Sequence, residues 1–442
     1  MAGTDNGRGL LRALGWGLYQ AGLAGAMVLA GPVLMIRRGA HYLPTLPGRL
    51  GRTLRSGPEA RGGVGGLWIH AVSVGEVGVA ATLARALPPG QPAVVTTITP
   101  TGQERARAAF AGRSEVAYLP FDLWPPVRRF FRRFRPAALV LVEGDYWPLV
   151  LREAARRGVP VAVVNGRVGD RSFRRMRRLG RLLGPALFGA VERFGVQTGT
   201  DAERLEALGV PKERITVTGN LKYETPEPPE LPELAGCVRG LAGGRPVLVA
   251  GSTMAGEEER VLDAFRRAGG GERVLLVLAP RHPERWDEAA ARIEERGLAF
   301  VRRSALGSGV GPAGSRRPDV LLLDSLGELA SVYRWAAAAF IGGTLVPTGG
   351  HNPLEAARWG VPVVVGPSME NFRGMARDFD AHSAWIRVTD AQGLAEVWCR
   401  WLEDPEAARR TGDKGEELVE ANRGALERTV EVLEPILAGL ER

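Results

Sequence analysis

Three acidic residues stand three positions after a small polar residue, each where an apolar run gives way to a helical pattern. The pairs are Ser73 and Glu76, Ser325 and Glu328, and Asn352 and Glu355. This spacing is that of a capping box, in which the polar residue caps a helix and the acid bonds back to it. The junctions also fall at the carboxyl ends of expected parallel strands, where open α/β sheets bind ligands and helix N-termini attract phosphate. The spacing alone leaves a structural cap and a ligand-binding role both open.

Cationic residues stand close to these junctions. Arg281 directly follows an apolar run, and its planar guanidinium suits a phosphate, although an ion pair with a neighbouring helix would explain it equally well. Lys222 ends the first half of the chain, where it would either face a cleft or be solvated. Gly342-Gly343 and Gly349-Gly350 precede the third junction and permit close approach of the backbone. Together these features favour a nucleotide-binding cleft.

The elements that must position these residues alternate between short apolar runs and helical patterns. Continuous apolar runs of this length are typical of buried parallel strands. Two series of them predict an α/β protein with two doubly wound, Rossmann-like domains facing a cleft. The expected strands cover 67–72, 93–97, 137–142, 159–165 and 194–197, then 246–250, 274–279, 319–323, 338–341 and 362–365. The expected boundaries are 61–222 for the first domain, 223–245 for a linker rich in Pro and Glu, 246–415 for the second domain and 416–442 for a C-terminal helix.

Basic residues are concentrated in the first half of the chain. The net charge is +9, but residues 1–222 hold 32 Lys and Arg against 15 Asp and Glu, whereas the remainder holds 26 against 34. Arginines mixed with bulky apolar residues cluster in 128–135 and 167–181. Such clusters suit an anionic membrane or a phosphorylated lipid, and also an RNA backbone or an ordinary solvated face. Cys237 and Cys399 are the only cysteines and the five histidines show no paired spacing, so we expect no disulfide framework, no metal site and no cofactor.

Residues 13–36 form 24 consecutive positions without a charge. As a helix they would extend about 36 Å, enough to cross a bilayer. Arginines on both sides, with more of them after the segment, favour an N-terminal anchor that keeps the body of the protein cytoplasmic. A cleaved signal peptide and a helix lying in the membrane interface are the alternatives.

Taken together, these residues resemble the 3-deoxy-D-manno-octulosonic acid (Kdo) transferases of lipopolysaccharide synthesis. The resemblance covers about residues 10 to 425 and rests on a series of ordered motifs. They are 68–76, 143–148, 165–167, 218–222, 251–253, 279–285, 326–329, 349–355 and 371–372. The resemblance implies a two-domain GT-B fold behind an N-terminal membrane helix. It also implies transfer of Kdo from CMP-Kdo to a lipid A precursor of the lipid IVA type, with inversion at the anomeric carbon.

The resemblance also implies a role for individual residues. Glu76 would be the general base, while Glu143, Asp145 and Lys222 would stabilise the transition state. The implied CMP site comprises Pro280, Arg281, Leu326, Gly327, Glu328, Asn352, Pro353, Leu354 and Glu355, and the implied acceptor site comprises Ser73, Gly75, Arg167 and Arg171.

The expected partners are CMP-Kdo, the phosphorylated lipid A precursor and the cytoplasmic face of the inner membrane, without nucleic acid. Two departures from the family pattern stand out, since Asp145 and Leu149 replace a Glu and an Asn, and Met254 replaces a His. The rival functions are a GT-B transferase that uses a UDP-sugar and a lipid-linked acceptor, and a membrane-tethered protein that binds polyanions through a degenerate cleft.

Overall fold

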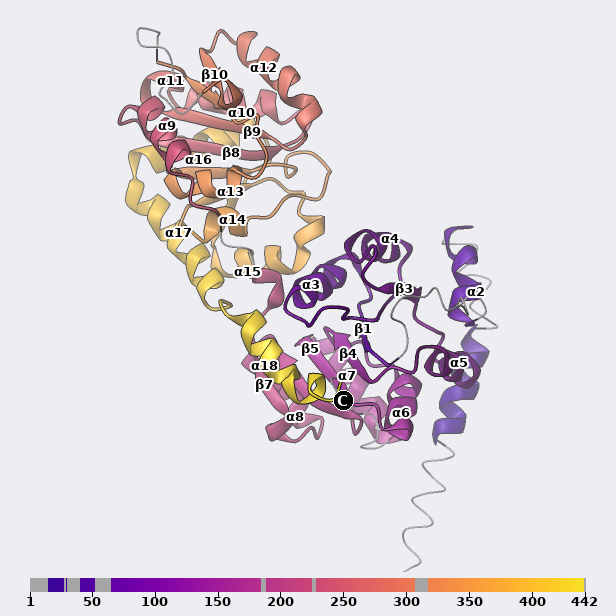
Figure 1. Ribbon diagram of the computed structural model, residues 1–442. Helices are drawn as coiled ribbons and strands as arrows, with labels where there is room; N and C mark the ends of the chain where they lie inside the picture. The colour runs from indigo at the N-terminus through magenta and orange to yellow at the C-terminus, as the bar shows by residue number, and fades with distance from the viewer. Residues whose placement is uncertain are drawn as a thin grey trace, which may run out of the picture. The chain divides into compact units, whose positions relative to one another are not determined.

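The computed structural model describes residues 15–27, 29, 40–51, 65–183, 188–224, 228–306 and 317–440. The chain divides into two compact units (Figure 1). The first unit comprises Met1–Glu224 together with Gly424–Arg442, and the second comprises Thr225–Arg423. Each unit is an α/β structure built on one parallel sheet, which confirms the predicted fold class of each half.

The first unit holds a seven-stranded parallel sheet in the order β3-β2-β1-β4-β5-β6-β7. Its strands are β1 (Leu67–His70), β2 (Val94–Thr97), β3 (Glu115–Tyr118), β4 (Ala138–Val142), β5 (Val161–Gly166), β6 (Val191–Val196) and β7 (Ile215–Val217). Its helices are α2 (Leu46–Arg49), α3 (Val74–Arg85), α4 (Pro100–Ala109), α5 (Trp124–Phe134), α6 (Pro148–Arg157), α7 (Asp170–Leu183), α8 (Gly199–Ala207) and α18 (Ala425–Leu437), with 3-10 turns η1 (Ala40–Thr45), η3 (Lys212–Arg214) and η4 (Leu221–Tyr223).

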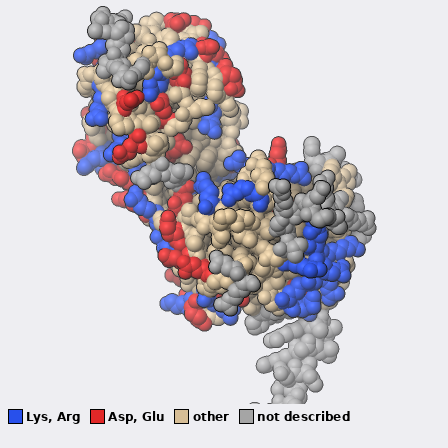
Figure 2. All heavy atoms as spheres, viewed as in Figure 1, with Lys and Arg blue, Asp and Glu red and all other residues tan. Residues whose placement is uncertain are grey.

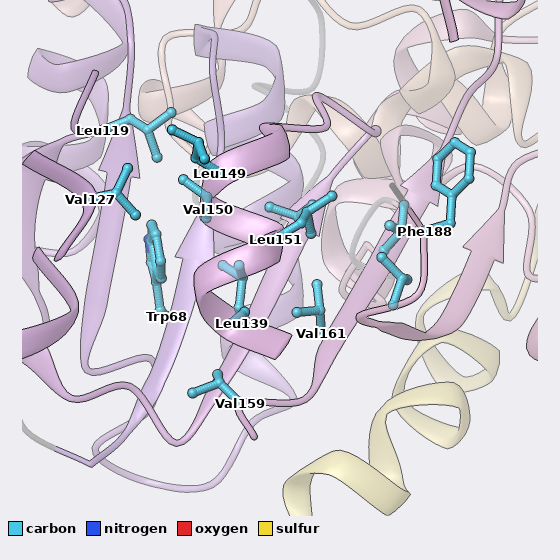
Figure 3. Close-up of a cluster of buried hydrophobic side chains, with 14 of the residues drawn as sticks. Trp68, Leu119, Val127, Leu139, Leu149, Val150, Leu151, Val159, Val161 and Phe188 are labelled. Atoms are coloured by element: carbon cyan, nitrogen blue, oxygen red, sulfur yellow. The ribbon is translucent and has the colours of Figure 1, made fainter. Parts of the chain in front are cut away.

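Apolar side chains alternate between the two faces of this sheet. Trp68, Leu139 and Val161 pack under α5 and α6 in the cluster of Figure 3, where Leu149 and Val150 of α6 point toward the strands. Their neighbours along the strands join a second cluster with α3, α4 and α18. The C-terminal α18, the yellow helix of Figure 1, therefore belongs to the core of the first unit, where it packs against β5, β6 and α3.

The second unit repeats the architecture with the order β10-β11-β9-β8-β12-β13-β14. Its strands are β8 (Val247–Thr253), β9 (Leu275–Pro280), β10 (Phe300–Arg302), β11 (Val320–Leu322), β12 (Ala338–Ile341), β13 (Val363–Val365) and β14 (Trp385–Arg387). Its helices are α9 (Pro232–Ala242), α10 (Glu258–Arg267), α11 (Gly270–Arg273), α12 (Trp286–Glu294), α13 (Leu329–Val332), α14 (Leu354–Ala357), α15 (Arg373–His382), α16 (Ala391–Glu403) and α17 (Pro405–Glu420), with 3-10 turns η5 (Pro283–Arg285), η6 (Arg303–Ala305), η7 (Tyr333–Trp335) and η8 (Glu370–Phe372).

The strand order reverses at one place in each sheet. In the first unit the chain runs outward from β1 through β2 to β3 and then crosses to β4 on the other side of β1. A switch point therefore lies between β1 and β4. In the second unit it lies between β8 and β12. Open parallel sheets bind ligands beyond the carboxyl ends of the strands at such points. The two switch points are therefore the places to look for a site.

The segments expected at the domain borders are partly structured. Residues 223–245, expected to be a linker, contain α9, which is in the second unit. The stretch 416–442 contains the end of α17, and the chain returns to the first unit at Gly424 before α18.

The expected membrane segment 13–36 lies partly outside the described residues. Residues 15–27 and 29 of it are helical. Within the described ranges, no helix is long and apolar enough to cross a bilayer.

Candidate functional site

Glu76 lies at the N-terminus of α3, directly after β1. The Ser73 side chain accepts the Glu76 N–H at 3.5 Å, and the Val72 N–H donates to Glu76 Oε2 at 2.8 Å. Ser73 Oγ also donates to Glu76 Oε1 at 3.0 Å. Ser73 is thus the N-cap as predicted, whereas the return bond of Glu76 goes to the N–H of Val72, one residue before the cap, and these bonds orient both carboxylate oxygens.

The environment of Glu76 also perturbs its acidity. The residue is 8% exposed, and burial raises its pKa from 4.5 to about 7. The hydrogen bonds from the Val72 N–H and the Ser73 hydroxyl lower the pKa of Glu76, while the negative charges of Glu143 and Asp145 raise it further. A carboxylate with a pKa near neutrality can both accept and release a proton under cellular conditions.

Glu143 and Lys222 approach Glu76 from other strand ends of the same sheet. Glu143 follows β4 on the far side of the switch point, and its Oε1 forms an ion pair with Lys222 Nζ. A side chain at Gly75 would meet Lys222 Nζ at 3.8 Å, so the ammonium lies over the start of α3. The structure therefore brings together Ser73, Gly75, Glu76, Glu143 and Lys222.

Asn165, at the end of β5, holds this arrangement in place. Its Nδ2 donates to Glu143 Oε1 at 3.3 Å, and its Oδ1 accepts the N–H of Leu221 at 2.8 Å, next to Lys222. Both Glu143 and Asn165 have positive φ, 63° and 52°, a conformation that is costly for residues other than glycine. The sequence motif 165–167 contained Asn165, but only the fold reveals this bridging role.

Asp145 faces a cavity of about 170 Å³ beside α6 and α7. Burial raises its pKa, the charge of Arg175 lowers it and that of Glu143 raises it. The cavity is also lined by Tyr19, Trp147 and Met176. Asp145 thus belongs to the same electrostatic group as Glu143, but its side chain opens into a separate pocket.

His70 positions the segment that carries these acids. It is buried, and its Nδ1 contacts Thr96 Oγ1 at 2.9 Å while its Nε2 accepts from Trp147 Nε1 at 3.2 Å. Burial lowers the pKa of His70 to about 4, so the ring is neutral and its two nitrogens have distinct roles. In the sequence, His70 falls within the expected strand 67–72 and the motif 68–76, without a role of its own.

Arg167 and Arg171 both have exposed side chains. The Arg167 N–H donates to the Glu143 carbonyl oxygen at 3.0 Å, whereas Arg171 lies on α7. Figure 2 shows Lys and Arg gathered on the first unit over α5 and α6. The predicted basic surface is therefore a feature of the fold as well as of the sequence.

In the second unit, Arg281 stands beyond the end of β9. Its N–H donates to the Thr253 carbonyl oxygen at 3.0 Å, and its side chain is exposed. Burial raises the pKa of Glu355, and the charges of Arg281 and Arg358 lower it. Burial lowers the pKa of His351 to about 4, assisted by Arg281. His351 Nε2 is buried and has no hydrogen-bond partner among the described residues.

The loop after β12 approaches β8 closely. A Cβ on Gly342 would overlap the carbonyl oxygen of Ser252, so only glycine fits there. Ser252 itself has a φ of 56°. Glu257 is buried beneath the loop and accepts N–H groups from Gly343, Thr344, Leu345 and Met254 at 2.6 to 2.9 Å. At the second switch point the loop after β12 is therefore held closely against β8 by these hydrogen bonds, and Ser252 has a strained backbone conformation.

The second and third predicted capping boxes are wrong. Glu328 binds Arg303 through two hydrogen bonds, at 3.0 and 3.1 Å, and accepts from Ser325 Oγ, but it occupies the N-cap position of α13 without a capping bond. Asn352 Oδ1 accepts the Leu354 N–H at 3.1 Å, but α14 starts only at Leu354. Both helices have four residues, too short to provide the expected dipole.

The remaining residues of the implied CMP site differ in accessibility. Pro280, Pro353 and Leu354 are buried, so the Leu354 side chain belongs to the core. Leu326 is 73% exposed, and Gly327 has a φ of 85°. Only part of this set presents side chains to a ligand.

Comparison with known proteins relates this chain to Kdo transferases. Residues 45–225 match the family model of 3-deoxy-D-manno-octulosonic-acid transferase (kdotransferase). The 3-deoxy-D-manno-octulosonic acid transferase of Bordetella pertussis is 36% identical over 408 residues, covering 90% of this chain and 93% of its own. The 3-deoxy-D-manno-octulosonic acid transferase of Haemophilus influenzae is 34% identical over 378 residues, which cover 84% of this chain and 87% of the relative. A solved structure is also similar, the crystal structure of the C-terminal CMP-Kdo binding domain of WaaA from Acinetobacter baumannii. The two sequences are 31% identical, the match covers 43% of this chain and 96% of that domain, and the TM-score is 0.39.

Proposed function

Because the chain belongs to the Kdo transferase family and is thus a glycosyltransferase that transfers Kdo, we propose that it moves Kdo from CMP-Kdo to a phosphorylated lipid A precursor of the lipid IVA type. The observation that carries the proposal is Glu76, a buried carboxylate with a pKa of about 7, beside the Glu143–Lys222 ion pair at the switch point of the first sheet. A base poised near neutrality is what deprotonation of a sugar hydroxyl requires.

In the proposed reaction, Glu76 takes the proton of an acceptor hydroxyl as its oxygen forms a bond to the anomeric carbon of Kdo. The bond from that carbon to the phosphate oxygen of CMP breaks, and CMP leaves with the electron pair. Attack opposite the leaving group inverts the anomeric centre. Lys222 stands next to Glu76 and offsets the negative charge that Glu143 brings to the site.

The donor is proposed to bind at the second switch point. Arg281 has an exposed guanidinium beyond β9 that can hold the CMP phosphate through two hydrogen bonds. Glu355 lies within the field of Arg281 and can accept from the ribose hydroxyls. Leu326, Gly327, Asn352 and the backbone of 353–354 would complete the pocket. The similar C-terminal domain of WaaA from Acinetobacter baumannii is a CMP-Kdo binding domain, which supports this choice of donor.

The surroundings of the enzyme are part of the same proposal. We expect a GT-B arrangement of the two units and an inner-membrane location with the catalytic units on the cytoplasmic face. The excess of Lys and Arg in residues 1–222 and its concentration over α5 and α6 support a polyanionic lipid acceptor at a membrane surface (Figure 2).

The test is transfer by the purified full-length chain in detergent micelles, with CMP-Kdo, the bis-phosphorylated lipid A precursor and mass spectrometry of the product. We expect mass increases of whole Kdo units, inhibition by CMP but not by UDP, and loss of product with Glu76→Gln. The matched control is Glu104→Gln, an exposed carboxylate on α4 of the same unit. No product from the wild type, or inhibition by UDP alone, would refute the assignment of donor and acceptor.

A further inference from the structure

The helix formed by residues 15–27 docks on the first unit through one face. Trp16 is 6% exposed, and the guanidinium of Arg152 lies 4.5 Å from its ring centre. Tyr19 donates its hydroxyl hydrogen to Asp122 Oδ2 at 2.7 Å, and Gln20 Nε2 donates to the Asp122 carbonyl oxygen at 3.1 Å. Trp16, Tyr19 and Gln20 thus bind the first unit from neighbouring positions of the helix.

Asp122 connects this helix to α6. Its carboxylate accepts the N–H groups of Leu149 and Val150 at 3.1 Å and so satisfies the first turn of α6, which has no capping side chain of its own. Segment 143–148, which contains the candidate acids Glu143 and Asp145, leads into α6 and ends at the first residue of that helix. The Tyr19 hydroxyl therefore acts on the same carboxylate that fixes the end of this segment.

Tyr19 also lines the pocket into which Asp145 opens, next to the candidate acids. It lines the cavity of about 170 Å³ together with Asp145, Trp147 and Arg175. A carboxylate, a guanidinium, an indole and a phenol suit a hydroxyl-bearing sugar ring better than an acyl chain, since they offer both acceptors and donors beside an aromatic surface.

We propose that the N-terminal helix is part of the acceptor-binding site, with Tyr19 as a positioning residue that forms one wall of the sugar pocket and holds segment 143–148 through Asp122. This inference rests on the proposed function, because it assigns a sugar of the acceptor to the pocket. It gives the helix a role separate from any attachment to lipid.

The opposite face of the same helix provides the control. Leu18 is 66% exposed and Leu29 is 78% exposed, and neither touches Asp122 or the cavity. Leu18→Ala should weaken sedimentation with vesicles of phosphatidylethanolamine and phosphatidylglycerol, but leave the KM for the acceptor within twofold. Tyr19→Phe keeps the ring and removes the hydroxyl, so vesicle binding should be unchanged.

The decisive measurement is the pair of KM values of Tyr19→Phe in detergent micelles. We expect the KM for the acceptor to rise about tenfold, as for the loss of one hydrogen bond to a charged group, with the KM for CMP-Kdo unchanged. Titration of the acceptor without donor should give the same loss of affinity, so this outcome does not depend on transfer. CMP binding by each variant verifies folding of the second unit, and the thermal midpoint verifies folding of the first.

Two results would overturn the inference. The first is an unchanged acceptor affinity in Tyr19→Phe. The second is an equal increase in acceptor KM for Leu18→Ala and Tyr19→Phe, since the helix would then act only as an anchor. A wild type that binds the acceptor but transfers no Kdo would instead count against the proposed function and leave the pocket assignment standing.

Discussion

Substituting Glu76 by Gln should abolish transfer and also stabilise the fold above neutral pH. Gln at this position can keep the capping geometry, because its amide oxygen can accept from Val72 and its NH₂ can donate to Ser73. What it removes is a carboxylate whose pKa is raised from 4.5 to about 7. Loss of transfer and the gain in stability both depend on the proton of this carboxylate, so both should change with pH around the same pKa.

The expected magnitude of the stability effect follows from this pKa. Between pH 4.5 and 7 the unfolded chain has already lost the proton of Glu76 while the folded chain retains it, so the free energy of unfolding of the wild type falls as pH rises. The full difference corresponds to about 3 kcal/mol, and about 2.5 kcal/mol of it lies between pH 5 and pH 8. The advantage of Glu76→Gln over the wild type should therefore grow by that amount across this interval.

The assay combines urea unfolding of both proteins at pH 5 and pH 8 with kcat/KM at low acceptor concentration. For the wild type, kcat/KM should rise about tenfold per pH unit below 7 and level off above it, while Glu76→Gln should be about 10² to 10⁴ times slower than the wild-type plateau and should lack this acid limb. An acid limb near pH 4.5, or a stability difference between the two proteins that does not change with pH, would refute the reasoning.

Other substitutions probe the remaining parts of the two sites. Arg281→Ala should weaken CMP binding about ten- to hundredfold in calorimetry, and Arg281→Lys should recover part of it, because charge is kept but the planar fork is lost. Lys222→Met should raise the pKa of Glu76 and move the acid limb of kcat/KM to higher pH, and an unmoved limb would place Lys222 outside the field of the base. Gly342→Ala should lower the thermal midpoint by about 5 °C or more through overlap with the backbone, whereas Gly236→Ala, with open space on α9, should be neutral or stabilising. Transfer should proceed equally with a chelator present, since Arg281 supplies the positive charge for a monophosphate leaving group; loss of activity would contradict this role.

Residues close to strand ends could be predicted from the sequence because a parallel sheet places them together whatever the details of the loops. Glu76 and Arg281 were found in this way, each directly after a buried apolar run. Asn165, Asp122 and Arg303 were not, because their partners are 22 or more residues away and nothing in the local spacing indicates them. Long-range hydrogen bonds of this kind depend on the register of the strands, which a single sequence does not determine.

Backbone strain is a second property that could not be predicted from the sequence. Glu143, Asn165 and Ser252 all have positive φ and all lie at the carboxyl ends of strands, Glu143 and Ser252 beside a switch point and Asn165 one strand further along the sheet. None is a glycine, so sequence patterns for turns pass over them. Each costs of order 1 kcal/mol or more, which the surrounding bonds must offset.

The contrast between Glu76 and Glu328 shows why spacing alone could not identify the general base. Both stand three residues after a serine, and both accept a hydrogen bond from its hydroxyl. Glu328 forms an ion pair with Arg303. Glu76 is instead buried near the charges of Glu143 and Asp145, which favour its protonated form. A purely structural cap gains from being ionised, whereas a base must give up part of that stability to bind a proton near pH 7. The neighbours that β4 brings to Glu76 therefore distinguish its role more clearly than the capping motif itself.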